Sequence, residues 1–356
     1  MVTLEPHFVH ATGLPEEDPK QSDQKIAHQQ RIRNRASVQY QVIASPASAS
    51  LAERLASQQP DRFTYHETSW GKFPDGTDNI VVSGFSPYNL ISGEHVLFLA
   101  EFGDNDVTLS QYQVMIVLLQ SFIKSLTVVL PYYPVGTMER VTTEGTVATA
   151  STYAHLFSSL PSCGTPTRLM VYDLHTLQNR FYLHGHAVAS LHTTIPLLKR
   201  RLETTQVDCI AFPDDGAAKR FQDSFSGSAK EIVVCGKTRG PNDKRTVKIQ
   251  EGSVAGRHVV IVDDLVQTGG TLYETGKVLK EAGAVSVSAF VAHAVFPNQS
   301  WKRFAKGGDR AVFDRFYVTN SVSTVTDQLP TGEGEVFEVL DLLDTVITDL
   351  DNFSSL

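Results

Sequence analysis

The segment best suited to chemistry is a short apolar run that ends in two carboxylates and continues into a glycine turn. Val259–Val262 predict a buried strand, and Asp263 and Asp264 follow it directly. Adjacent carboxylates can accept hydrogen bonds from paired ribose hydroxyls or help to hold a hydrated divalent cation. The turn that follows contains Thr268, Gly269, Gly270 and Thr271. Its glycines would let backbone N–H groups approach an anion, which predicts a phosphate site, with an ordinary Asx turn before a helix as the alternative.

Acidic and imidazole side chains follow two other apolar segments. Asp173 and His175 come after Arg168–Tyr172, and Asp214 comes after Val207–Phe212. Ligands of open parallel sheets bind beyond the carboxyl ends of the strands, so the three groups together predict an active site. A histidine at the end of a strand can also be structural. Zinc is a weaker alternative, because the spacing of the nearby histidines fits no zinc ligand pattern: His175, His184, His186 and His192.

A cationic segment lies between the strand predicted at Val207–Phe212 and the strand predicted at Val259–Val262. Residues 236–248 contain five Lys or Arg side chains and one acid, a local charge of +4. The basic residues are Lys237, Arg239, Lys244, Arg245 and Lys248. A loop of this kind is suited to closing over phosphates and excluding water, although a run of charges alone is more often a solvated loop.

The elements that would position these residues alternate between strand and helix. Strands are predicted at Tyr40–Ala44, Leu126–Pro131, Arg168–Tyr172, Val207–Phe212, His258–Val262 and Val285–Ala292, and helices at Gln111–Lys124 and Thr271–Ala282. Continuous apolar strands that alternate with helices indicate parallel sheets covered on both faces. We therefore expect two α/β halves that meet near residues 180–195.

Composition limits the classes of function. The chain has 356 residues, of which 41% are hydrophobic and 20% charged, and its net charge is −8. About two domains are expected, and a general nucleic-acid or anionic-membrane binder is excluded for lack of a basic face. Residues 331–356 hold seven acids and no Lys or Arg, so the rest is nearly neutral. Three scattered cysteines and the absence of a long apolar run predict a cytoplasmic protein without a membrane span.

The strand and glycine turn resemble the phosphoribosyl-pyrophosphate loop that type I phosphoribosyltransferases share with ribose-phosphate pyrophosphokinases. Four further motifs occur in the order expected for the second family: Pro131–Arg140, Asp173–Tyr182, Phe212–Phe221 and His293–Pro297. The resemblance extends from about Gln41 to Asp349 and is strongest to the plant-type (class II) branch. Thr137, Met138 and Gln267 stand where the bacterial and mammalian branch has an Arg-Gln pair and an extra acid, which leaves phosphate activation and ADP allostery open.

The resemblance implies an α/β fold of two type I phosphoribosyltransferase-like domains, each a mainly parallel sheet flanked by helices. They would span residues 38–188 and 189–356, after a polar extension at 1–37 that can be disordered. The implied reaction transfers the β,γ-diphosphate of ATP to the anomeric hydroxyl of ribose 5-phosphate, with Mg²⁺, and gives phosphoribosyl pyrophosphate and AMP. The alternatives are an inactive family member with a regulatory or scaffolding role and, less well supported, a base-specific phosphoribosyltransferase.

The same resemblance assigns roles to single residues. Ribose 5-phosphate would be held by Asp263, Asp264, Thr268, Gly269, Gly270 and Thr271. Magnesium would be associated with His175, Asp214 and Asp173, and Lys237 and Arg239 would be catalytic residues that stabilise the transferring diphosphate. The nucleotide would contact Phe73, Asp75, Arg140 and His175. In the family the turn that holds Phe73 and Asp75 reaches the ATP site of a neighbouring subunit, which implies a homo-oligomer; an Asp-Gly pair alone is also a common hairpin turn.

Overall fold

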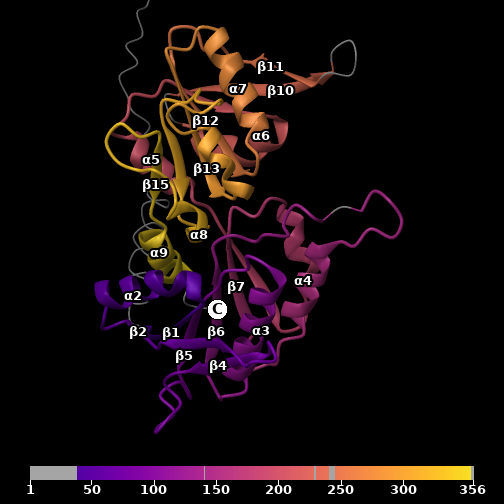
Figure 1. The fold of residues 1–356 in the computed structure, drawn as a ribbon, viewed down its shortest axis with the longest axis vertical. Helices are drawn as coiled ribbons and strands as arrows, with labels where there is room; N and C mark the ends of the chain where they lie inside the picture. The colour runs from indigo at the N-terminus through magenta and orange to yellow at the C-terminus, as the bar shows by residue number, and fades with distance from the viewer. Residues whose placement is uncertain (1–37, 140, 228–229, 240–244, 354–356) are drawn as a thin grey trace, which may run out of the picture.

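Two sheets are stacked along the long axis of the molecule, one built from each half of the chain (Figure 1). The computed structural model describes residues 38–139, 141–227, 230–239 and 245–353, and it describes the backbone alone for residues 237–239, 245–246 and 353. The extension at 1–37 and Arg140 lie outside the described residues, as do the side chains of Lys237 and Arg239. Within the described ranges, no helix is long and apolar enough to cross a membrane.

The sheet of the N-terminal half is entirely parallel. Its order is β2-β1-β5-β6-β7-β8, formed by β1 (Tyr40–Ala44), β2 (Phe63–Tyr65), β5 (His95–Leu99), β6 (Ser125–Leu130), β7 (Thr167–Tyr172) and β8 (Ala187–His192). A separate antiparallel hairpin is formed by β3 (Thr68–Lys72) and β4 (Asp78–Val82), and its tip contains Phe73 and Asp75. The predicted parallel sheet is confirmed for this half.

The sheet of the C-terminal half is parallel except at one edge. Its order is β11-β10-β9-β12-β13-β14-β15, with β9 (Cys209–Phe212), β10 (Glu231–Arg239), β11 (Arg245–Glu251), β12 (His258–Val266), β13 (Ser286–Ala294), β14 (Phe316–Thr319) and β15 (Phe337–Leu340). Only β11 runs antiparallel, so the cationic segment forms the two strands of an edge hairpin, with residues 240–244 outside the described part.

Helices cover both faces of each sheet. They are α2 (Ala49–Gln58), α3 (Asn105–Leu119), α4 (Thr149–Ser158), α5 (Ile195–Leu202), α6 (Asp215–Phe221), α7 (Gly270–Glu281), α8 (Ser323–Thr326) and α9 (Leu343–Phe353). Short 3₁₀ turns are η1 (Pro46–Ser48), η2 (Leu177–Tyr182), η3 (Gln222–Phe225) and η4 (Pro297–Arg303). The helix predicted at Gln111–Lys124 begins earlier, because the Asp104 carboxylate accepts a hydrogen bond from the Val107 amide and caps the helix at that point.

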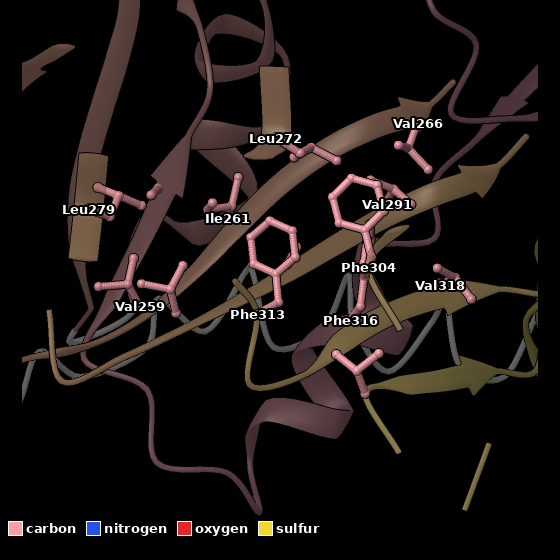
Figure 2. Close-up of a cluster of buried hydrophobic side chains, with 14 of the residues drawn as sticks. Val259, Ile261, Val266, Leu272, Leu279, Val291, Phe304, Phe313, Phe316 and Val318 are labelled. Carbon is pink, nitrogen blue, oxygen red and sulfur yellow. The ribbon is translucent and has the colours of Figure 1, made fainter. Parts of the chain in front are cut away.

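The strand pattern explains why the helices pack on two sides. On β12, Val259 and Ile261 belong to one apolar cluster, whereas Val260 and Val262 belong to another on the opposite face. Figure 2 shows the first cluster, in which Leu272 of α7 lies beside a group of phenylalanines that includes Phe304, Phe313 and Phe316. Because both faces are buried, the strand is continuously apolar, as the sequence predicts.

The boundary between the halves differs from the expected position. The expected division between residues 188 and 189 falls inside β8, which pairs along its length with β7, up to Tyr172 opposite His192. Residues 189–192 therefore belong to the N-terminal sheet, because their pairing with β7 continues to the end of β8.

The acidic end of the chain also returns to the N-terminal half (Figure 1). The α9 side chains Val346 and Leu350 are buried in the same cluster as Leu55 of α2. Asp351 pairs with the buried Arg62 at 2.6 Å, and Asp349 pairs with His192 at 3.2 Å. The α9 part of the acidic tail thus packs on the N-terminal half, where its carboxylates pair with basic side chains.

Candidate active site

The two adjacent carboxylates lie near the end of β12, a central strand that pairs with β9 and β13. Asp263 is half-buried, and Asp264 is 6% exposed. The Asp263 Oδ1 atom accepts a hydrogen bond from the Asp264 amide at 3.0 Å. Successive strand residues point to opposite faces, so the pair presents carboxylates on two sides of the strand end. Each carboxylate can therefore accept a hydrogen bond from a different hydroxyl group of one ligand.

The glycine turn begins α7 and requires its first glycine. Gly269 caps the helix with φ +69°, a left-handed conformation that only glycine adopts readily. A Cβ atom at Gly269 would lie 2.3 Å from the Cζ atom of Phe304, whose ring is buried in the phenylalanine cluster. The turn therefore rests directly on the core, and the first amides of α7 have no partners within the helix. A phosphate bound there would meet these N–H groups and the positive end of the helix dipole.

A cavity of about 750 Å³ joins these elements. Its walls include the six residues predicted to hold ribose 5-phosphate, together with His175 and Asp214: Asp263, Asp264, Thr268, Gly269, Gly270, Thr271, His175 and Asp214. The cavity lies between the halves, because His175 follows β7 of the N-terminal sheet whereas the others belong to the C-terminal half. The structure brings these eight predicted residues together.

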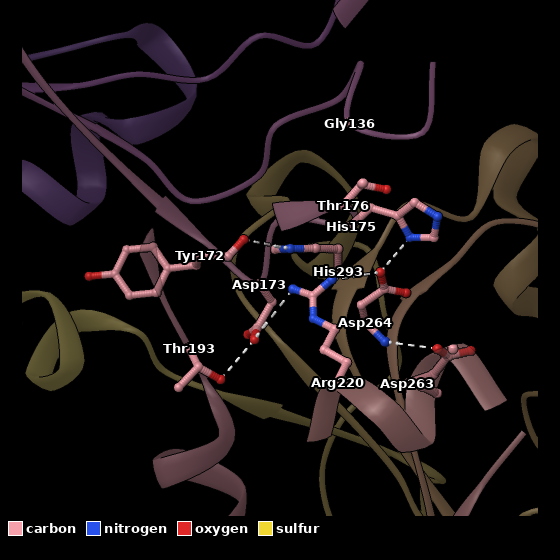
Figure 3. A network of polar contacts seen from close by, with 12 residues as sticks. Gly136, Tyr172, Asp173, His175, Thr176, Thr193, Arg220, Asp263, Asp264 and His293 are labelled. Atoms are coloured by element: carbon pink, nitrogen blue, oxygen red, sulfur yellow. Dashed lines mark hydrogen bonds and ion pairs between the residues drawn. The ribbon is translucent and has the colours of Figure 1, made fainter. Parts of the chain in front are cut away.

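A chain of polar contacts crosses the junction between the halves (Figure 3). The His175 Nδ1 atom is 2.5 Å from the Asp264 Oδ2 atom. Arg220 of α6 donates to the same Asp264 oxygen at 3.3 Å, and its other terminal nitrogen lies 4.0 Å from Asp173. Arg220 thus lies between a carboxylate of each half, and it also lines the cavity.

The surroundings shift the pKa values of Asp263 and Asp264 in opposite directions. Burial raises the pKa of Asp263 well above its usual range, and the neighbouring Asp264 charge adds to this effect. Burial alone would also raise the pKa of Asp264, but the His175 hydrogen bond and the His175 and Arg220 charges hold it below its usual value. The hydrogen bond with Asp264 raises the pKa of His175. The contacts thus favour the charged forms of His175 and Asp264 and the protonated form of Asp263.

Asp173 is placed as a structural acceptor behind the cavity and is not among its lining residues. It is 2% exposed, and one of its oxygens accepts hydrogen bonds from the Thr194 amide at 2.8 Å and the Thr194 hydroxyl at 2.5 Å. The other oxygen accepts from the Thr193 hydroxyl at 2.8 Å. Its φ of +38° is rare for a residue other than glycine, and this network holds it there.

Asp214 is placed at the helix start beside the cavity. Its Oδ1 atom accepts from the Gly216 and Ala217 amides at 3.0 and 3.1 Å, which caps α6. No hydrogen bond to its Oδ2 atom is made by the described residues. Magnesium is commonly held by one or two carboxylates, with water and substrate phosphates as further ligands. The free oxygen of Asp214 and the half-buried Asp263 fit that pattern.

The other two residues associated with magnesium fit it less well. Both oxygens of Asp173 are engaged by hydroxyl and amide donors, and the Nδ1 atom of His175 faces Asp264. Imidazole is also a softer ligand than magnesium prefers. No group of three or more His, Cys, Asp or Glu side chains in the described part of the chain is placed to hold a metal by itself. A magnesium ion here would depend on oxygens from the substrates.

The hairpin tip that holds Phe73 and Asp75 is not brought into this cavity. Phe73 is 51% exposed at the β3–β4 tip, and the Asp75 carboxylate caps its own turn by accepting from the Thr77 amide at 3.0 Å. Figure 1 shows β4 near one end of the long axis and α7 near the other. Lys237 and Arg239 lie on β10 with their side chains outside the described part, and Arg140 lies wholly outside it.

Sequence reasoning did not single out two residues that build the site. One is Arg220, which follows Asp214 on α6 and whose position in a cationic helix turn was the available signal. The other is His293 on β13, which is fully buried and whose Nε2 atom donates to the Tyr172 carbonyl of β7 at 3.1 Å. Burial lowers the pKa of His293, which favours the neutral ring, and the neutral tautomer with its proton on Nε2 can make this bond between the halves.

Comparison with known proteins places this geometry in a family. A phosphoribosyl transferase domain model matches residues 198–324. Ribose-phosphate pyrophosphokinase 4 of Arabidopsis thaliana is 43% identical over 302 residues, which cover 83% of this chain and 87% of the relative. The ribose-phosphate pyrophosphokinase 4 of Oryza sativa subsp. japonica is 44% identical over 307 residues, 83% and 90% of the two chains. A Helicobacter pylori ribose-phosphate pyrophosphokinase is 28% identical over 267 residues, 72% of this chain and 77% of the relative.

A solved structure supports the fold. The crystal structure of phosphoribosylpyrophosphate synthetase from Mycobacterium smegmatis superposes with a TM-score of 0.70 over 87% of this chain and 96% of that chain, at 21% identity. The predicted architecture of two phosphoribosyltransferase-like domains is therefore confirmed. The identity to the two plant proteins is also higher than to the bacterial relative, as the class II resemblance predicts. The chain belongs to the ribose-phosphate pyrophosphokinase family.

Proposed function

We propose that this protein is an active ribose-phosphate diphosphokinase that makes phosphoribosyl pyrophosphate and AMP for nucleotide biosynthesis. The observation that carries the proposal is the cavity in which the double carboxylate, the glycine turn and His175 face one another. Family membership supports the same reaction, because the similar plant proteins are named ribose-phosphate pyrophosphokinases. An inactive family member would be expected to lose these groups, and they are present here.

Ribose 5-phosphate would be held at both ends by this site. The 5-phosphate would bind the free amides of the turn that begins α7, and the ring hydroxyls would donate to Asp263 and Asp264. Binding at both ends fixes the orientation of the sugar, so that the anomeric hydroxyl faces the space in front of His175. Such positioning supplies a large part of the acceleration in phosphoryl transfer.

In the reaction, the anomeric oxygen forms a bond to the β-phosphorus of ATP, and the bond from that phosphorus to the bridging α,β-oxygen breaks. AMP leaves with that oxygen, and the hydroxyl proton passes to solvent or to a nearby base. His175, whose charged form is favoured by the hydrogen bond with Asp264, would neutralise phosphate charge on the ATP side. Lys237 and Arg239, which lie on β10 where it forms a hairpin with β11, would stabilise the diphosphate in transit.

Magnesium is the proposed metal. Asp214 and Asp263 would contribute ligands at the cavity wall, with His175 nearby, and Asp173 would support the site from behind by fixing Arg220. When bound, the ion would neutralise the phosphate oxygens of ATP. Loss of activity on chelation, restored by magnesium, tests this point, and isothermal titration of the ion with and without ATP tests binding separately.

We also propose a homo-oligomeric enzyme with cytoplasmic location, in which Phe73 and Asp75 serve the ATP site of a neighbouring subunit. The exposed β3–β4 tip, which is outside the cavity of its own chain, supports this arrangement. Two inactive variants, Phe73→Ala and Lys237→Ala, should regain activity when mixed, because one shared site would then contain both intact residues. Absence of recovery in verified mixed oligomers would contradict the shared site.

A coupled assay that measures AMP formation from ATP, ribose 5-phosphate and magnesium tests the proposed function. Lys237→Ala should abolish most turnover while leaving ribose 5-phosphate binding largely intact. Turnover should depend on ribose 5-phosphate and should not require a nucleobase. Nucleotide formation from phosphoribosyl pyrophosphate and a nucleobase would instead identify a phosphoribosyltransferase.

A further inference from the structure

The segment Phe304–Phe313 forms the support behind the phosphate-binding turn. The Phe304 ring packs against Gly269. The Phe313 ring packs against Gly276 of α7, where an added Cβ atom would lie 2.7 Å from the Phe313 Cε1 atom. The two rings stack on each other with centroids 5.9 Å apart (Figure 2). Both ends of the segment are therefore fixed to the core under the turn, and the residues between them are held close to the start of α7.

Arg310 lies in this segment and contacts the turn itself. Its Nη1 atom donates to the Thr268 carbonyl at 3.0 Å, and its guanidinium carbon lies 5.4 Å above the ring of Tyr273 on α7. A Cβ atom on Gly270 would lie 3.9 Å from the same nitrogen. Backbone hydrogen bonds fix the position on both sides, because the Arg310 amide donates to Arg303 and its carbonyl accepts from Val312, each at 2.8 Å.

The positive charge of Arg310 is compensated only in part, by the Tyr273 ring and by the charge of the neighbouring Asp309. Among the described residues it forms no ion pair, and the adjacent Asp309 carboxylate is engaged by Arg303. A guanidinium has five N–H donors, and one of them is used in the bond to Thr268. Arg220, the cation that contacts the double carboxylate, is already paired with Asp264. A cation without an ion pair among the described residues thus lies beside the turn that begins α7, whose first amides have no partner within the helix.

We infer that Arg310 is a substrate-binding residue for the 5-phosphate of ribose 5-phosphate. Its charge attracts the dianion to the turn, and its bond to the Thr268 carbonyl keeps the turn amides directed at the phosphate. The inference rests on the proposed function, because it assumes that the sugar phosphate occupies this turn. Its physical basis is independent of the reaction, because a guanidinium without an ion pair interacts strongly with a partly desolvated phosphate bound beside it.

Steady-state kinetics of Arg310→Ala, with each substrate varied in turn, test the inference. The KM for ribose 5-phosphate should rise about tenfold, the lower end of the range for a charge-assisted contact at a partly exposed site. The kcat and the KM for ATP should stay within about twofold, because the contact is made equally in the ground and transition states. Titration of ribose 5-phosphate into the full-length protein by calorimetry should show the same loss of affinity without ATP.

Matched variants separate charge from structure. Lys306→Ala removes one exposed cation from the same segment and should leave the KM for ribose 5-phosphate unchanged. Arg310→Lys should retain most of the affinity, whereas Arg310→Gln, which can still donate to the Thr268 carbonyl, should resemble Arg310→Ala. Higher ionic strength should also weaken binding to the wild-type protein more than to Arg310→Gln.

Three results would overturn the inference: an unchanged KM for ribose 5-phosphate in Arg310→Ala, equal losses for both substrates, or full affinity in Arg310→Gln. The wild-type measurement keeps the two proposals apart. A wild-type protein that forms no phosphoribosyl pyrophosphate contradicts the proposed function. An active wild type whose Arg310 variants behave normally contradicts only the role of Arg310.

Discussion

Replacement of Gly269 by alanine should destabilise the C-terminal sheet and disable the phosphate turn at once. The left-handed conformation costs an L-residue about 1–2 kcal/mol. The new methyl group would lie 2.3 Å from the Phe304 ring, which is 1% exposed and enclosed by other phenylalanines. Overpacking of this kind costs about 1–3 kcal/mol. The two effects together predict a loss of about 2–5 kcal/mol in the free energy of unfolding.

Two other glycines of the same half separate these effects. Gly256→Ala places a methyl group at φ +73° with nothing within 4 Å, so it should show the backbone cost alone. Gly270→Ala adds a methyl group at the first residue of α7, where the nearest atom is 3.9 Å away, and should change the free energy of unfolding by less than about 0.5 kcal/mol. We therefore expect Gly270→Ala to be the most stable of the three variants, Gly256→Ala to be intermediate, and Gly269→Ala to be the least stable.

Urea unfolding followed by tryptophan fluorescence gives the required measurement. The chain has two tryptophans, and Trp301 packs at the edge of the phenylalanine cluster, so a Trp70→Phe background reports on the C-terminal half. Displacement of the turn should also lower kcat/KM for ribose 5-phosphate about 100-fold. Equal stability of Gly269→Ala and Gly256→Ala, with normal activity, would refute the proposed packing of the turn on Phe304.

Three further predictions follow from the contacts that join the halves. The raised pKa of His175 means that its pair with Asp264 stabilises the fold fully below the unfolded histidine pKa of about 6.5, and that this stability is lost as pH rises through the folded value. The difference in free energy of unfolding between wild type and His175→Ala should therefore decrease from pH 6 to alkaline pH; a constant difference would argue against the pair. Asp173→Asn should cost about 2–3 kcal/mol by urea unfolding, because an amide group would face N–H or O–H donors that the carboxylate accepts; an unaffected midpoint would show that the network is unimportant. Asp351→Asn should destabilise the N-terminal half by about 3 kcal/mol, seen through Trp70, since it leaves a buried arginine unpaired, whereas the exposed Asp344→Asn should have little effect; similar results for both would contradict the docking role of α9.

The strand and turn of the active site could be predicted because local sequence determines them. Four apolar residues, two carboxylates and a pair of glycines define the end of β12 and the start of α7 within one continuous segment. The left-handed Gly269 and the buried Val259–Val262 each meet a local requirement of backbone geometry or burial. Positions such as these can be inferred from residue type and spacing alone.

Contacts between distant segments could not be predicted in the same way. Arg220 reaches Asp173 only because α6 packs across the junction, and the acidic tail docks on Arg62 through a helix that returns to the other half. The role of Asp173 as an internal acceptor depends on two threonines that follow β8. None of these pairings leaves a periodic pattern in the sequence, because each depends on how separately formed elements pack together.

We propose above that the residues around this cavity promote transfer of a diphosphate group from ATP to ribose 5-phosphate. The most direct test is ³¹P NMR of a reaction that contains the purified protein, ATP, ribose 5-phosphate and magnesium. We expect AMP and phosphoribosyl pyrophosphate to appear in equal amounts, and neither to appear without the sugar phosphate. Formation of ADP with a ribose bisphosphate, or no turnover by a folded protein that binds both substrates, would contradict this reaction.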